Sequence, residues 1–261
     1  MASDRVVSEE EWIEARRNVL EAEKRLTAES DRVAEMRRQL PWLEVKEEYV
    51  FRREGLDGAV EEKSLGDLFG DKDDLIVVHL MFEEGWQKPC KNCSFWADQY
   101  DGVIPHLTQK SSFAVIAQAS PGKLKETAVR KGWCFPLYSH GGTSFGRDMG
   151  VEFTAEQLSS GLKIANYGSN APFGSSTQGM TVFHRSQGRL FRTYSLYSRG
   201  FDHLNLAYGF LDLLPHGRDT AGPDASPYPM CWIKHKEEYA DPSCALPNDP
   251  AHDADGSKLN Q

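Results

Sequence analysis

The sequence has no excess of positive charge, few cysteines and no long hydrophobic stretch. Its 30 lysines and arginines are outnumbered by 39 aspartates and glutamates, which leaves a net charge of −9. A protein that binds nucleic acid or a membrane through its overall charge is therefore not expected. The longest apolar run, residues 75–82, contains His79 and is far too short to cross a bilayer. The N-terminal residues are rich in charge and show no apolar signal segment, so we expect a cytoplasmic protein.

Five cysteines in 261 residues are too few for a fold that depends on disulfides. Two of them, Cys90 and Cys93, form a Cys-x-x-Cys pair, and the others are far apart in the sequence: Cys134, Cys231 and Cys244. In a reducing compartment such a pair indicates redox chemistry or metal binding more often than a structural disulfide.

Residues 8–40 have the pattern of one long helix. An apolar residue recurs at every seventh position: Trp12, Val19, Leu26, Val33 and Leu40. A second row consists of Ala15, Ala22 and Met36, with Glu29 as its polar exception. Such heptads are typical of a coiled coil, although a helix packed along its own domain fits them equally well. Ser8 and Glu11 predict a capping box at its start, and Pro41 ends it. From the heptads we expect a homodimer formed through this helix.

The order of the remaining segments predicts an α/β protein. The pattern indicates two buried strands, two helices, a hairpin and a closing helix, at residues 75–82, 90–104, 113–117, 123–131, 180–194 and 202–214. This order, with a Cys-x-x-Cys pair directly after the first strand, is typical of the thioredoxin-like fold, a mixed sheet flanked by helices.

The sequence divides into three parts by composition. Residues 1–41 hold the heptad helix, and residues 42–216 hold the thioredoxin-like domain with an inserted loop near residues 155–178. Residues 217–261 are rich in Pro and Asp and are expected to form an extension with a mobile tail.

The Cys-x-x-Cys pair is the strongest candidate for chemistry. Two cysteines on the first turn of a helix share one face and lie within disulfide reach. The unpaired N–H groups of that turn favour a thiolate, and Lys88 and Lys91 add positive charge on both sides of Cys90. We therefore predict that Cys90 is the attacking thiolate and Cys93 the resolving thiol.

A metal site is the alternative interpretation of the same pair. Cys90 and Cys93 together with His106 or His140 could bind copper, iron or zinc, since thiolate and imidazole suit these ions. The neighbouring side chains are equally open to two interpretations. Trp86 and Trp96 line a pocket for a small substrate or belong to the core, and Asp98 accepts a proton near the thiols or is solvated.

The sequence resembles the thioredoxin-like family catalogued as domain of unknown function 899. The resemblance covers residues 8–240 and rests on Trp42, Leu65-Gly66-Asp67-Leu68-Phe69, Cys90-Lys91-Asn92-Cys93-Ser94-Phe95-Trp96-Ala97-Asp98 and Gly132-Trp133-Cys134-Phe135-Pro136. It implies a sheet similar to that of peroxiredoxins, with the cysteine pair at the usual redox position, and no settled substrate. The sequence also departs from better-known relatives. Gln178-Gly179-Met180 stands where thioredoxins have a cis-proline, and Gln87-Lys88-Pro89 where peroxiredoxins have a threonine.

Three functions follow from these observations. The first is an oxidoreductase that acts through Cys90 and Cys93 on a disulfide, a peroxide or a small organic substrate. The second is a copper, iron or zinc oxidase or dioxygenase of a small molecule. The third is a non-catalytic assembly module with a thioredoxin-like fold.

Overall fold

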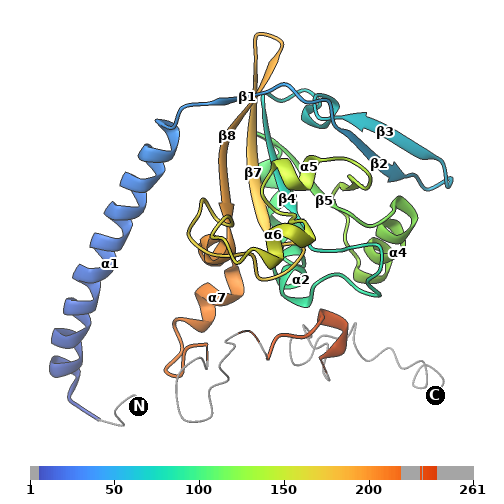
Figure 1. The fold of residues 1–261 in the computed structure, drawn as a ribbon. Helices are drawn as coiled ribbons and strands as arrows, with labels where there is room; N and C mark the ends of the chain where they lie inside the picture. Colours follow the sequence, from blue (N-terminus) through green and yellow to red (C-terminus); the bar gives the residue numbers. More distant parts are fainter. Residues whose placement is uncertain (1–5, 219–229, 231, 240–261) are drawn as a thin grey trace, which may run out of the picture.

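The structure is a computed structural model that describes residues 6–218, 230 and 232–239 (Figure 1). Most of the predicted extension, residues 217–261, lies outside the described residues, and so do Cys231 and Cys244. Among the described residues no helix is long and apolar enough to cross a membrane.

One mixed sheet forms the centre of the molecule. In the described part of the chain its strand order is β1-β8-β7-β4-β5-β6-β2-β3. The strands are β1 Leu43–Val45, β2 Val50–Glu54, β3 Val60–Ser64, β4 Asp74–His79, β5 Ser112–Ala117, β6 Leu137–Ser139, β7 Gly179–Ser186 and β8 Arg189–Tyr197. β4, β5 and β6 pair in parallel, and the other pairs are antiparallel.

The inner strands confirm the thioredoxin-like fold. Four inner strands lie side by side in the order β8-β7-β4-β5. Of these four, β4 and β5 come first in the chain and are parallel to each other. The hairpin β7–β8 follows later and pairs with the other edge of β4 in the antiparallel sense. The chain crosses from β4 to β5 through α2 Lys91–Ala97 and α3 Tyr100–Leu107. The predicted arrangement of strand, helix, strand and hairpin is therefore observed, with the cysteine pair between β4 and β5.

The sheet has a separate hydrophobic core on each face. Side chains alternate between the faces along β4, so Val78 belongs to the core that contains Cys93, and Val77 belongs to the core that contains Phe145. Helix α4 Pro121–Lys131 packs on the first core through Leu124, and α5 Phe145–Asp148 on the second. Because β4 is buried on both faces, its sequence is almost continuously apolar.

Two sequence predictions are confirmed in detail. The N-terminal helix α1 spans Glu9–Arg38 and begins with the predicted capping box of Ser8 and Glu11. The hairpin is longer than predicted, and its turn consists of Gln187 and Gly188, both with positive φ (52° and 72°). Positive φ at both turn residues matches the right-handed twist of the two strands.

The predicted helix over residues 202–214 is present but shorter, and it begins later than expected. A 3₁₀ segment, η2 Ser198–Leu204, precedes the short α7 Leu206–Leu211. Between them Asn205 has extended backbone, and its side chain accepts a hydrogen bond from the amide of Tyr208. Asn205 therefore caps a new helix instead of continuing one. The inserted loop near residues 155–178 contains α6 Ala155–Ser159, and the remaining short elements are η1 Asp67–Phe69 and η3 Lys236–Glu238.

Helix α1 lies apart from the sheet along one side of the molecule (Figure 1). It buries no residue against the described part of the chain, and the side chains of Trp12 and Leu26 are 58% and 70% exposed. Its C-terminal end is the exception, where Arg37 lies over the ring of Tyr194 in β8. A solvated helix with an apolar row along it is an unusual arrangement.

We predict that α1 pairs with α1 of a second copy. Pairing would cover the apolar row, which alone gives little stability to the helix. Light scattering at micromolar concentration should give twice the monomer mass. The double substitution Val19→Glu and Leu26→Glu should give a monomer, whereas Arg17→Glu on the opposite side of the helix should remain dimeric. A wild-type monomer would contradict this prediction.

Candidate functional site

The cysteine pair lies where α2 begins, just beyond the end of β4. The chain leaves β4, makes a loop over residues 83–89 and returns, so that the amide of Cys90 donates to the carbonyl of Met81 at 2.9 Å. Cys90 is the N-cap residue of α2, and Cys93 follows one turn later. Cys90 is half-buried, whereas the side chain of Cys93 is buried. Of the two sulfurs of this pair, that of Cys90 is therefore the one open to an incoming substrate.

The surroundings of Cys90 stabilise its thiolate. The thiol of Cys93 donates a hydrogen bond to the sulfur of Cys90, and this contact lowers the pKa of Cys90 most. The main-chain N–H groups of Cys93 and Asn92 and the charge of Lys91 lower it further. Burial acts in the opposite direction, and the pKa of Cys90 becomes about 6. A thiol of this acidity is a nucleophile at neutral pH.

The same hydrogen bond has the opposite effect on Cys93. Because its proton is held by Cys90 and its sulfur is buried, the pKa of Cys93 lies well above its ordinary value. The pair therefore consists of one half-buried thiolate and one buried thiol. This asymmetry agrees with the predicted roles of the two residues, which stay predictions.

The two lysines that flank Cys90 have different surroundings. Lys91, at the start of α2, contributes the positive charge that lowers the pKa of Cys90. The ammonium group of Lys88 instead forms an ion pair with Glu238, with 2.6 Å between the nitrogen and oxygen. Lys88 thus ties the loop before Cys90 to a segment from the far end of the described chain.

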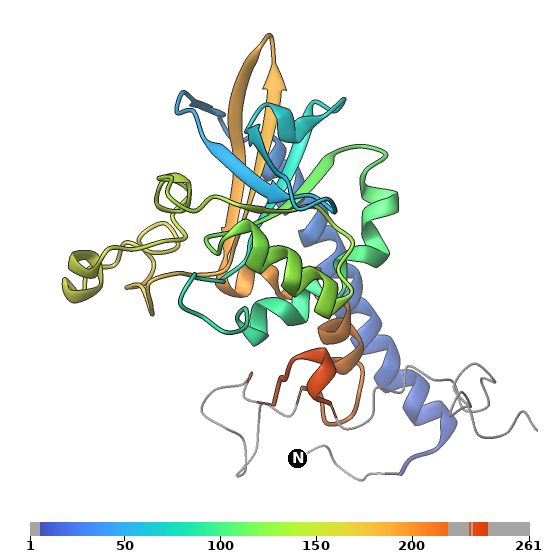
Figure 2. The ribbon, with the colours of Figure 1, turned by 90° about the vertical axis from the view of Figure 1, so that its right-hand side faces the viewer.

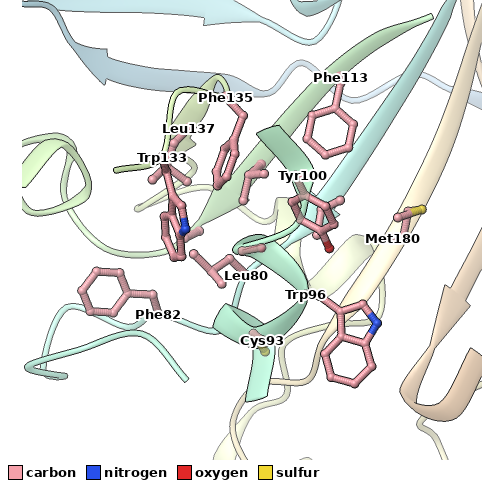
Figure 3. Close-up of a cluster of buried hydrophobic side chains, with 14 of the residues drawn as sticks. Leu80, Phe82, Cys93, Trp96, Tyr100, Phe113, Trp133, Phe135, Leu137 and Met180 are labelled. Carbon is pink, nitrogen blue, oxygen red and sulfur yellow. The ribbon is translucent and has the colours of Figure 1, made fainter. Parts of the chain in front are cut away.

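The aromatic candidates belong to the core rather than to an open pocket. Trp96 is 3% exposed, and its indole N–H donates to the carbonyl of Phe201 at 3.1 Å. Trp86 is partly buried against the same core. Figure 3 shows Cys93, Trp96 and Tyr100 among the side chains of this core.

Asp98 has a structural partner. Its carboxylate accepts a hydrogen bond from the indole N–H of Trp133 at 2.7 Å. Burial raises its pKa, and the hydrogen bond from Trp133 opposes this. Asp98 therefore connects the end of α2 to the segment that follows α4.

The predicted histidine ligands do not join the cysteines. His140 contacts the ring of Phe145, which belongs to the core on the other face of the sheet, and its Nε2 lies 3.1 Å from a carboxylate oxygen of Glu152. His106 lies in the last turn of α3 and is exposed. Among the residues that the structure describes, no three His, Cys, Asp or Glu side chains form a metal-binding group. The structure thus brings together only the two cysteines of the predicted ligand set.

Two features of the site were not predicted from the sequence. The hydroxyl of Tyr100 is buried in the core that contains Cys93, and it has no hydrogen-bond partner in the described part of the chain. The second is a buried cluster of Lys131 and His235, which joins α4 to residues 232–239. Neither feature has a sequence motif, because each depends on contacts between distant segments.

Several solved structures share parts of the arrangement at low similarity. A cysteine-to-serine mutant of peroxiredoxin Q from Xanthomonas campestris is 12% identical with a TM-score of 0.39, over 62% of this chain and 90% of that one. Reduced Prx3 from Vibrio vulnificus, in complex with H2O2, is 13% identical with a TM-score of 0.38, over 57% and 82%. Peroxidoxin BcpB from Mycobacterium tuberculosis is 14% identical with a TM-score of 0.37, over 60% and 87%. Similarities at this level carry no argument about the reaction.

The family comparison is more direct. No curated protein matches the chain. The family described as "Bacterial protein of unknown function (DUF899)" matches residues 1–239. This match covers most of the 261 residues, including the cysteine pair, α1 and residues 232–239. The chain therefore belongs to the DUF899 family.

Proposed function

We propose that this protein is a thiol oxidoreductase in which Cys90 attacks the substrate and Cys93 resolves the product. The observation that carries the proposal is the hydrogen bond from the buried thiol of Cys93 to the half-exposed sulfur of Cys90 at the N-cap of α2. It supports different roles for the two residues, because the sulfur of Cys90 is ionised and accessible whereas the neighbouring thiol of Cys93 keeps its proton.

With a disulfide as substrate, the reaction is a two-electron exchange. The thiolate of Cys90 attacks one sulfur, a mixed disulfide forms, and the other sulfur leaves as a thiolate that takes a proton from water. The thiol of Cys93 then loses its proton and attacks the sulfur of Cys90. The bond between Cys90 and the substrate breaks, the second substrate sulfur leaves as a thiol, and the pair is oxidised to a disulfide.

With a hydroperoxide, the same pair gives a different first product. The thiolate of Cys90 attacks the terminal oxygen, the O–O bond breaks, and an alcohol leaves after taking up a proton while Cys90 becomes a sulfenic acid. Attack by Cys93 then forms the disulfide and releases water. In both cases an external dithiol must reduce the disulfide and restore the pair.

Tyr100 fits the resolving step. When Cys90 is derivatised, it no longer accepts the hydrogen bond from Cys93, and the sulfur of Cys93 must become a thiolate in a buried place. The unpartnered hydroxyl of Tyr100 lies in the same buried core, and burial and the charge of Cys93 raise the pKa of Tyr100, so the two groups interact electrostatically although no hydrogen bond joins them in this structure. We infer that Tyr100 positions and stabilises the thiolate of Cys93.

The acidity of Cys90 gives a direct test. Alkylation of Cys90 by iodoacetamide should be fast at neutral pH and fall as the pH drops through about 6, because the thiolate takes up a proton there. Cys93→Ala removes the donor and should move this midpoint upward toward 9.0, the ordinary value. The same midpoint in both proteins would refute the role of Cys93 as donor.

The redox state of the pair gives a second test. After treatment with hydrogen peroxide or a small disulfide, peptide mapping by mass spectrometry should show one disulfide between Cys90 and Cys93, which a dithiol reverses. Cys93→Ser should trap Cys90 as a sulfenic acid or a mixed disulfide, and Cys134→Ser should behave as wild type. If the pair stays reduced under all these conditions, the proposed function is wrong.

Tyr100 can be tested by stability and kinetics together. Tyr100→Phe should raise the free energy of unfolding in urea by about 1 kcal/mol, because it removes a buried hydroxyl without a partner. It should also slow formation of the disulfide after Cys90 is oxidised. Tyr197→Phe is the matched control, since its hydroxyl donates to the carbonyl of Met149 at 2.7 Å, and it should lower stability by about 1 kcal/mol. A destabilised Tyr100→Phe with unchanged disulfide formation would contradict the assignment.

A further inference from the structure

Residues 232–239, which we call the clasp, lie against the α2 end of the molecule in both views (Figures 1 and 2). Ile233 and His235 are buried, while the residues between and after them are exposed. Ile233 is 0% exposed, so its burial anchors the segment against the rest of the molecule.

A buried lysine holds the middle of the clasp. The side chain of Lys131, at the end of α4, is 0% exposed, and its ammonium nitrogen lies 2.9 Å from Nδ1 of His235 and 2.7 Å from a carboxylate oxygen of Glu237. A buried ammonium group is unfavourable unless other groups accept its hydrogen bonds. The clasp supplies these acceptors through His235 and Glu237. The ammonium group of Lys131 is therefore stable in its buried position only while the clasp is closed.

The clasp contacts the chain on both sides of Cys90. Glu238 forms the ion pair with Lys88, two residues before Cys90. At the other end of the clasp, the ring of Trp232 meets the ring of Phe95 edge to face at 5.7 Å, and Phe95 lies in α2 beyond Cys93. The clasp therefore contacts both the loop that precedes Cys90 and helix α2, which follows it.

We propose that the clasp determines which substrates reach Cys90: when closed it admits small molecules such as hydroperoxides and small disulfides, and it must open before a protein disulfide can react. This proposal rests on the proposed function, because it concerns the substrates of the same thiolate. The half-buried position of Cys90, together with contacts that hold both flanks, supports it.

The cluster around Lys131 also provides a means of release. His235 faces Lys131, Glu237 and Glu238, and Lys88 lies nearby. Burial and the charge of Lys131 lower the pKa of His235, so the closed clasp prefers the neutral imidazole. When the pH falls below 6.5, the ordinary value for histidine, protonation of His235 favours the open state. The reason is that the protonated imidazole of His235 can no longer accept a hydrogen bond from Lys131 and repels its positive charge.

The test compares two alkylating reagents at Cys90 by peptide mapping, iodoacetamide and a maleimide attached to a long polyethylene glycol. Glu237→Gln with Glu238→Gln removes the two carboxylates that face Lys131 and Lys88 and leaves the buried residues intact. At neutral pH this variant should react with the large reagent about tenfold faster than wild type, with little change for iodoacetamide. Lys234→Gln, an exposed position in the clasp, is the matched control and should behave as wild type. Equal rates with the large reagent in all three proteins would overturn the proposal.

Hydrogen exchange gives a readout that does not depend on the thiols. Exchange over residues 232–239, corrected for the intrinsic effect of pH, should increase below pH 6.5 in wild type, and His235→Gln should abolish this increase. The same increase in His235→Gln would overturn the release mechanism. If the clasp behaves as expected but Cys90 and Cys93 never form a disulfide, the clasp stands and the proposed redox function fails.

Discussion

The hydrogen bond from Cys93 to Cys90 is the interaction on which the rest of the site depends. It lowers the pKa of Cys90 and raises the pKa of Cys93, and it requires that Cys90 be the N-cap of α2 so that Cys93 follows one turn later. That start is set by the loop after β4, which brings the amide of Cys90 back to the carbonyl of Met81. The acidity of Cys90 therefore depends on the geometry of the loop that follows β4.

The sheet separates two kinds of buried polar group. The cysteines belong to the core on one face, whereas His79 and His140 both contact Phe145 in the core on the other. A strand buried on both faces places successive side chains in different environments, so residues close in sequence to the thiols can be far from them chemically. The separation explains why the imidazoles of His79 and His140 do not share a ligand set with the thiols.

Local patterns allowed much of the fold to be predicted. The strands β4 and β5, the hairpin β7–β8 and helix α1 each follow from periodicity within one segment. The start of the helix within residues 202–214 was missed because a single side chain, Asn205, caps a new helix where the apolar spacing continues. The cysteine pair was found by its motif, but Tyr100 and Lys131 could not be, since their partners and neighbours come from distant parts of the chain and leave no spacing to recognise.

The burial of Lys131 also has a consequence for the order in which the chain acquires its structure during synthesis. His235 follows Lys131 by 104 residues, so the sheet, α2 and both cysteines leave the ribosome well before the imidazole that accepts from the lysine. Until then the ammonium group remains in water, and the nascent chain carries an acidic thiolate with no segment fastened beside it. If residues 232–239 control access to Cys90 as proposed, the thiolate is most accessible in the interval before these residues arrive.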